Sequence, residues 1–191
     1  MNAKQIFNAS NALSFLRLLL IIPAWYSFTY LELTTAKYIV AGLGIFAAIT
    51  DILDGYLARK LNQITEFGKI IDPLADKVLV VYVVLSLFII GEIPDYYFYM
   101  IAGRDILILT GGLIVSKKLG KVLPSDYVGK ATVLAISFTL LMILLNVDTH
   151  SIPYLLLYYF SIGLIFISLF NYILKAVKAL NKEQSWSFLI T

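Results

Sequence analysis

The sequence predicts an all-α integral membrane protein, a bundle of about six transmembrane helices with its functional site near the cytoplasmic face. Of its 191 residues, 60% are hydrophobic and 14% are charged, and the mean hydropathy is +0.87. A soluble domain of this length does not carry so much apolar sequence. The chain has no cysteine, which excludes a disulfide framework and a thiolate metal site.

Apolar runs alternate with short polar segments, and each run has the length of one membrane crossing. Pro23 predicts a kink in the first run, because proline cannot donate the helical hydrogen bond. Residues 32–37 predict a short loop, and the polar residues 60–66 predict a hairpin between the second and third runs. The spans are expected at about residues 11–30, 36–60, 66–90, 96–115, 127–145 and 154–177. We expect one transmembrane domain over residues 1–180 and a C-terminal tail over residues 181–191.

Lysine and arginine gather at the helix ends and loops on one side of this layout. The opposite loops hold mainly acids, with Lys37 as their single lysine. In membrane proteins the excess of basic residues lies on the cytoplasmic side. We therefore expect a multi-pass protein of the cell (inner) membrane, with both termini and the site cytoplasmic. Its surroundings are membrane lipids, and no nucleic-acid partner is expected.

Four aspartates stand out in this apolar chain, two on each side of the predicted hairpin. Asp51 and Asp54 are three residues apart, and a helix places them on one face. Asp72 and Asp76 are four residues apart, with the same result. A hairpin centred near Gln63 brings the two pairs to nearly equal depth, at about 1.5 Å of rise per residue. The sequence thus predicts four carboxylates converging on one small volume.

Carboxylates this close raise one another's pKa, and a bound cation is the usual resolution. Oxygen ligands suit Mg²⁺, Mn²⁺ or Ca²⁺. Two ions a few ångströms apart are a common arrangement for moving phosphoryl groups, so we expect two ions, Mg²⁺ or Mn²⁺, at the four aspartates. The alternative is that the acids pair with the lysines and arginine of the same stretch. Acids inside a membrane are costly and usually functional, which favours the metal site.

The same stretch resembles a known family. Its pattern is Asp51-x2-Asp54-Gly55-x2-Ala58-Arg59-x8-Gly68-x3-Asp72-x3-Asp76. This pattern matches, at every fixed position, the signature of the CDP-alcohol phosphotransferase family. Residues 67–69 and 72–77 resemble the phosphatidylglycerophosphate synthase and cardiolipin synthase branches. The resemblance implies transfer of a phosphatidyl group from CDP-diacylglycerol to an alcohol, with release of CMP.

The resemblance also implies roles for individual residues. Asp51, Asp54 and Asp72 would be metal ligands, and Asp76 would be a ligand that also serves as the base on the acceptor hydroxyl. The N-terminal run Asn11-x2-Ser14-x2-Arg17 is similar to the family's Asn-x2-Thr-x2-Arg pattern. The residues implied to bind CDP-diacylglycerol are Asn11, Ser14, Gly55, Ala58, Arg59, Thr65 and Gly68.

Basic side chains indicate what kind of acceptor the enzyme uses. A phosphorylated acceptor such as glycerol 3-phosphate needs positive charge, for which Arg104, Lys130 and Lys69 are the candidates. Arg104 lies within a span, where an unpaired guanidinium is expensive. Its neighbour Asp105 points about 100° away on a helix, so we expect it to be an imperfect partner. Residues 129–132 resemble phosphatidylglycerophosphate synthases, whereas the Arg-Asp dipeptide is closer to the cardiolipin synthase branch.

The interpretation is therefore an enzyme that makes phosphatidylglycerophosphate from CDP-diacylglycerol and glycerol 3-phosphate. Transfer to phosphatidylglycerol, giving cardiolipin, or to an inositol phosphate remains open as an alternative. A divalent-cation transporter that uses the acids as its pathway is the alternative from another class. Transporters generally repeat interrupted helices in matching halves, and no matching half is evident here. A homodimer is possible on family grounds, but nothing in the sequence establishes it.

Overall fold

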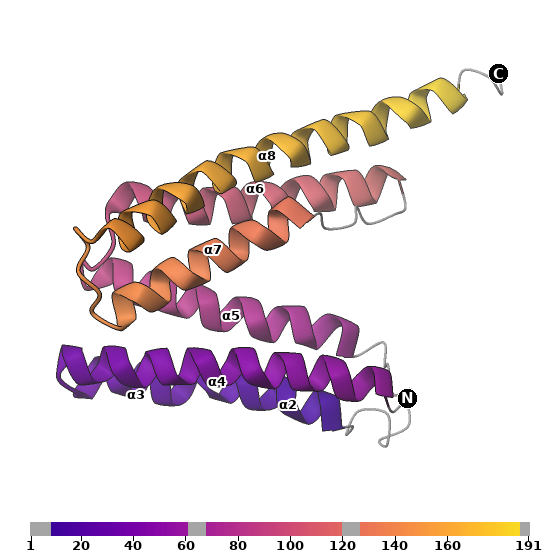
Figure 1. Cartoon of the computed structure of the whole chain (residues 1–191). Coiled ribbons are helices and arrows are strands. Elements are labelled where there is room, and N and C mark those ends of the chain that lie inside the picture. The colour runs from indigo at the N-terminus through magenta and orange to yellow at the C-terminus, as the bar shows by residue number, and fades with distance from the viewer. Residues whose placement is uncertain (1–8, 61–67, 120–126, 188–191) are drawn as a thin grey trace. The chain divides into compact units, whose positions relative to one another are not determined.

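The computed structural model is built from α-helices, and no strand occurs in the part of the chain that it describes. The backbone is described for residues 9–60, 68–119 and 127–187, and the side chains for residues 14–53, 77–117 and 127–179. The helices, labelled in Figure 1, are α2 (Ala9–Leu19), α3 (Ile21–Tyr30), α4 (Leu33–Lys60), α5 (Gly68–Ile89), α6 (Asp95–Leu119), α7 (Tyr127–Leu144) and α8 (Ile152–Ser187). The predicted all-α fold class is thus confirmed.

Four helices are long and apolar enough to cross a membrane. Their spans are Leu33–Leu53, Asp95–Lys117, Tyr127–Leu144 and Ile152–Ala179. Many large apolar side chains on these helices are exposed, among them Ile106, Leu113 and Phe166. Apolar surface on this scale is stable in lipid rather than in water. The chain is therefore a membrane protein.

The kink predicted at Pro23 is a break between two helices. α2 ends at Leu19 and α3 begins at Ile21, with Pro23 in the first turn of α3. Proline has no N–H to donate to the carbonyl of Leu19, and its ring crowds that same carbonyl. The helix therefore ends four residues before the proline, and the Ala24 N–H resumes the pattern by donating to the Leu20 carbonyl at 3.2 Å.

The chain divides into two compact units, and the first consists of residues 1–92 and 140–147. In this unit α2 packs on α4 and α5, and α3 packs on α4. A small apolar core joins Leu20, Ala47 and Leu79, with Ile21 and Leu43 against it. Small side chains such as Ala47 let the helices approach closely. This packing holds the two aspartate-bearing helices, α4 and α5, against the N-terminal helix.

The second unit consists of residues 93–139 and 148–191. Here α6 runs beside α8 (Figure 1). Near one end of the pair, the Tyr97 hydroxyl lies 2.7 Å from Ser161 Oγ. Further along, Gly111 faces the ring of Tyr172, where an added Cβ would lie 3.0 Å from Tyr172 Cε1. The predicted sixth span corresponds to α8, which continues as helix to Ser187.

Two helices, α5 and α7, end within the first unit in the same way. Gly91 follows α5 with φ 77°, and Asn146 follows α7 with φ 54°. After α5, the N–H groups of Gly91 and Glu92 donate to the carbonyls of Phe88 and Leu87. The turn after α7 repeats this pattern at Asn146 and Val147. Gly and Asn are the residues that best tolerate this left-handed conformation.

These turns place polar groups beside Lys37. The position of Lys37 corrects one expectation from the sequence. The second span begins at Leu33, so Lys37 lies inside α4 rather than in a loop. Its side chain is buried, and Nζ donates to Glu92 Oε2 at 2.6 Å and to Asn146 Oδ1 at 2.9 Å. Lys37 is thus a buried ion-pair partner in the first unit.

Candidate functional site

The two predicted aspartate pairs lie on two neighbouring helices of the first unit. Asp51 and Asp54 are near the end of α4, and Asp72 and Asp76 are near the start of α5. The two helices contact each other. The side chains of Asp54, Asp72 and Asp76 lie outside the described residues, so convergence of the four carboxylates remains a prediction.

Asp51 is the member of the set whose side chain is described. It is half-exposed, and its Oδ1 accepts a hydrogen bond from Arg17 at 2.5 Å. The second carboxylate oxygen has no partner among the described residues. Arg17 therefore holds Oδ1 of Asp51, while the rest of the carboxylate is accessible.

Arg17 is the functional candidate that sequence reasoning missed. It is 1% exposed, although it carries a permanent charge on an apolar helix. Its Nη2 donates to Ser14 Oγ at 3.2 Å, one turn earlier on α2. A charge inside a membrane segment is a functional candidate by default. The same rule selects Arg104 and, from the sequence alone, equally selects Arg17.

The donor chemistry of Asp51 fits a divalent cation. Hard cations such as Mg²⁺ and Mn²⁺ take oxygen ligands, and an accessible carboxylate oxygen supplies one. Among the described side chains, no three His, Cys, Asp or Glu residues gather at one point. Three of the four predicted ligands fall outside that set, so their metal role stays a prediction.

The residues predicted to bind CDP-diacylglycerol lie around the same helices. Asn11 and Ser14 are on α2. Three more of them, Gly55, Ala58 and Arg59, are on α4, and Gly68 is the first residue of α5. Ser14 is fully buried against Arg17. Thr65 lies outside the described residues, as do the side chains of Asn11, Ala58 and Arg59.

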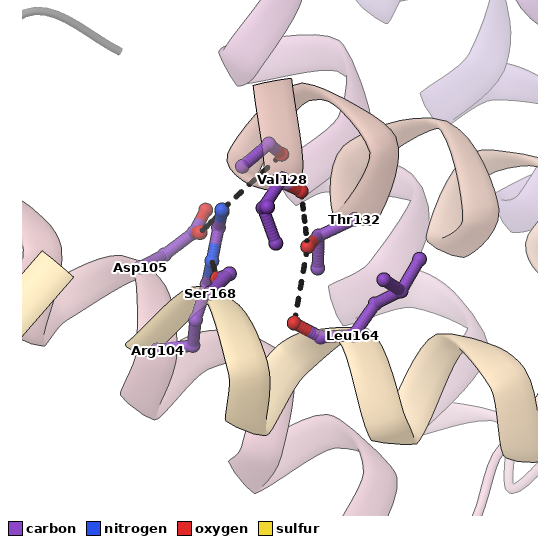
Figure 2. Close-up of polar contacts among 7 residues, drawn as sticks. Arg104, Asp105, Val128, Thr132, Leu164 and Ser168 are labelled. Atoms are coloured by element: carbon purple, nitrogen blue, oxygen red, sulfur yellow. Dashed lines mark hydrogen bonds and ion pairs between the residues drawn. The ribbon is translucent and has the colours of Figure 1, made fainter. Parts of the chain in front are cut away.

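Arg104, predicted to bind the acceptor, is the centre of a polar network in the second unit (Figure 2). The residue is 8% exposed, and NH1 donates to Asp105 Oδ1 at 2.8 Å. Nε donates to Ser168 Oγ on α8 at 3.2 Å, and NH2 to the Gly129 carbonyl on α7 at 3.4 Å. Groups from three helices thus fix the guanidinium.

The expectation that Asp105 is an imperfect partner is wrong. Adjacent helical residues do diverge by about 100°, but the long arginine side chain bends back to reach the carboxylate. Asp105 remains partly exposed, with a side-chain exposure of 27%. The carboxylate is thus the more accessible member of the pair, since the Arg104 side chain is only 9% exposed.

The start of α7 lies beside this network. Thr132 is fully buried, with Oγ1 2.7 Å from the Val128 carbonyl oxygen and 3.2 Å from the Leu164 carbonyl oxygen (Figure 2). It joins α7 to α8. Lys130 is exposed in the first turn of α7, and the side chain of Lys69 lies outside the described residues.

Comparison with known proteins adds an independent finding. A family model described as CDP-alcohol phosphatidyltransferase matches residues 7–177. A protein of Aquifex aeolicus (strain VF5) is 42% identical over 147 residues, which is 74% of this chain and 82% of that protein. A protein of Bacillus subtilis (strain 168) is 32% identical over 164 residues, 78% of this chain and 80% of that protein. A protein of Rickettsia felis is 33% identical over 149 residues, 78% and 81% of the two chains. All three are named CDP-diacylglycerol--glycerol-3-phosphate 3-phosphatidyltransferase.

Proposed function

Because the chain belongs to the CDP-alcohol phosphatidyltransferase family, we propose that it transfers a phosphatidyl group from CDP-diacylglycerol to glycerol 3-phosphate. The products are phosphatidylglycerophosphate, a precursor in phospholipid biosynthesis, and CMP. The observation that carries the proposal is the pair of contacting helices α4 and α5, each bearing two aspartates of the family pattern. The names of the relatives support the choice of acceptor.

The reaction exchanges one phosphorus–oxygen bond for another. The acceptor hydroxyl oxygen bonds to the phosphorus next to diacylglycerol, and the bond from that phosphorus to the bridging oxygen breaks. CMP leaves with the bridging oxygen and its electron pair, while the hydroxyl proton passes to Asp76 as the base. Divalent ions, on which this family generally depends, stabilise the charge of the diphosphate.

The remaining roles follow the family pattern. The proposed metal ligands are Asp51, Asp54, Asp72 and Asp76, with two ions, Mg²⁺ or Mn²⁺. The proposed contacts to CDP-diacylglycerol are Asn11, Ser14, Gly55, Ala58, Arg59, Thr65 and Gly68. The proposed acceptor contacts are Arg104, Lys130 and Lys69.

The buried guanidinium of Arg104 supports a phosphorylated acceptor. Its three donor groups are held by α6, α7 and α8, so little side-chain entropy remains to be lost when an anion binds. The second candidate is transfer to phosphatidylglycerol, favoured by the Arg104-Asp105 dipeptide, which resembles the cardiolipin synthase branch.

We further place the aspartates and both termini at the cytoplasmic side of the cell membrane. The excess of lysine and arginine at that end of the helices supports this orientation. At that depth the acyl chains of CDP-diacylglycerol stay in lipid, while the cytidine and a polar acceptor reach water.

Release of CMP tests the proposal directly. Purified protein is incubated with CDP-diacylglycerol, Mg²⁺ or Mn²⁺, and one acceptor at a time. We expect CMP with glycerol 3-phosphate and none without an acceptor. Asp76→Asn should abolish release because the base is lost. Asp95→Asn, an exposed aspartate at the start of α6, is the matched control and should retain it.

Other results of the CMP-release assay would each point to a different function. CMP release with phosphatidylglycerol alone, or with an inositol phosphate alone, would replace the acceptor but keep the chemistry. No CMP with any acceptor, together with Mn²⁺ uptake into vesicles, would replace the enzyme by a cation transporter.

A further inference from the structure

We propose that Arg17 is a positioning residue that holds the Asp51 carboxylate ready for a divalent cation. This inference rests on the proposed function, because it concerns the metal site of that reaction. It assigns a role to the third residue of the N-terminal Asn11-x2-Ser14-x2-Arg17 run, which the aspartate motif leaves unexplained.

The first observation is how deeply Arg17 is buried. At 1% exposure it is the largest side chain among the fully buried residues that the structure describes. Burying a guanidinium in a small helical unit is unfavourable unless its charge is compensated. One compensating group is a carboxylate of the aspartate motif, Asp51, 34 residues later in the chain.

The second observation is the asymmetry of the pair. Arg17 is enclosed, whereas the Asp51 side chain is 50% exposed. The contact uses Oδ1 alone, at 2.5 Å, and leaves the other oxygen without a partner among the described residues. A carboxylate held in this way has a fixed orientation and still offers one oxygen to a cation.

The third observation is that Arg17 is itself held. Ser14 Oγ accepts from its second terminal nitrogen at 3.2 Å, and Ser14 is fully buried. The guanidinium fork therefore donates to both α2 and α4, through one terminal nitrogen to Ser14 and through the other to Asp51. Lysine has a single nitrogen on a flexible stem and does not reproduce this fork. Ser14, Arg17 and Asp51 are thus joined by a chain of hydrogen bonds that runs from α2 to the first aspartate of the motif.

Two physical effects of Arg17 on a cation have opposite signs, and they separate the proposal from a merely structural role. As a nearby positive charge, Arg17 repels a cation, so its removal would tighten metal binding. As a positioning group, it orients a ligand, and loss of such outer partners weakens metal binding, commonly by about 10- to 100-fold. The proposal requires the second effect to dominate.

The test is direct Mn²⁺ binding without substrates. Wild-type protein and variants in lipid nanodiscs are titrated with Mn²⁺, and free Mn²⁺ is measured by its electron paramagnetic resonance signal. We expect Arg17→Gln to weaken binding by about 10- to 100-fold. Arg17→Lys should lie between Arg17→Gln and wild type. Lys178→Gln, which removes an exposed lysine of α8, is the charge-matched control and should leave the affinity unchanged.

Ser14→Ala keeps the proposal testable if Arg17→Gln does not fold, as judged by gel filtration and far-UV circular dichroism. It preserves both charges and should weaken Mn²⁺ binding by less than Arg17→Gln does. Unchanged or tighter binding in Arg17→Gln, or unchanged binding in Ser14→Ala where Arg17→Gln is unfolded, overturns the positioning role alone. A wild-type protein that binds no Mn²⁺ overturns this inference together with the proposed metal site, whereas CMP release in the acceptor assay judges the proposed reaction separately.

Discussion

Three buried cations, Arg17, Lys37 and Arg104, each meet a carboxylate within hydrogen-bonding distance. Unpaired charges are costly inside a membrane, so each carboxylate offsets part of the cost of burying its cation. The partners differ in exposure: the side chain of Asp51 is 50% exposed, against 26% for Glu92 and 27% for Asp105. The carboxylate of Asp51 is therefore the most accessible of the three, which suits a group that also binds a ligand.

Arg104 permits a prediction about the acceptor. If its guanidinium binds the phosphate of glycerol 3-phosphate, Arg104→Ala should raise the KM for that acceptor on the order of 10- to 100-fold, the range expected for a charged hydrogen bond. The KM for CDP-diacylglycerol should stay nearly unchanged. Steady-state kinetics with each substrate varied in turn measure both values.

Ser168→Ala is the control for that experiment, because it removes the Nε partner of Arg104 but keeps the charge. It should raise the acceptor KM less than Arg104→Ala does. An equal rise in both KM values for Arg104→Ala would instead indicate a general loosening of α6 against α8.

The turns that follow α5 and α7 lie in the first unit and contact the first turns of α4. The left-handed residues Gly91 and Asn146 end α5 and α7, and the turns place Glu92 and Asn146 at the Lys37 ammonium group. Lys37 precedes Asp51 on α4 by fourteen residues, which is about 21 Å of helix rise. The ion pair thus fixes α4 at the end remote from its aspartates.

Loss of this ion pair should destabilise the protein without acting on the chemistry. Lys37→Met removes two hydrogen bonds of a charged group, each worth about 1.5–3 kcal/mol, and leaves Glu92 with a charge to solvate. We expect a lower thermal midpoint in detergent, followed by tryptophan fluorescence. Lys178→Met, at an exposed position, should leave the midpoint unchanged. An unchanged midpoint for Lys37→Met would show that the pair contributes nothing net.

The charge distribution of the whole chain predicts its orientation in the membrane. α7 has 18 residues and therefore a length of about 27 Å, close to the thickness of the hydrocarbon layer. Its first residue, Tyr127, is 91% exposed, and Thr149 is exposed in the turn between α7 and α8. If basic segments are cytoplasmic, these two positions lie on opposite sides of the membrane.

Cysteine labelling checks this orientation, and the natural chain offers a background without cysteine. In intact cells a membrane-impermeant maleimide should label Thr149→Cys. Tyr127→Cys should react only after the membrane is permeabilised. The reverse labelling pattern would place the basic segments outside the cell and contradict the predicted orientation. Labelling of both positions in intact cells would mean that α7 does not span the membrane.

The apolar runs were sufficient to predict an all-helical membrane protein, because a membrane segment must satisfy its own backbone hydrogen bonds. Of the six expected spans, four correspond to helices long and apolar enough to cross a membrane in the part of the chain that the structure describes. The family resemblance carried by the aspartate motif was likewise confirmed, since the spacing of acids and small residues is local. The kink before Pro23 followed from a local rule as well, although proline breaks the helix at Leu19 and Leu20 rather than at its own position.

Only the tertiary structure revealed which charges meet. Arg17 and Asp51 are 34 residues apart, and Lys37 and Glu92 are 55 apart, so no periodicity within one helix relates them. Arg104 and Asp105 are neighbours, yet helical geometry alone argued against their pairing, because it takes no account of how far an arginine side chain can bend. The amino-acid sequence thus determined the helices and the acids that they carry. The packing of those helices decided which cation holds which carboxylate, because ion pairing depends on side-chain reach between elements that the sequence does not place in space.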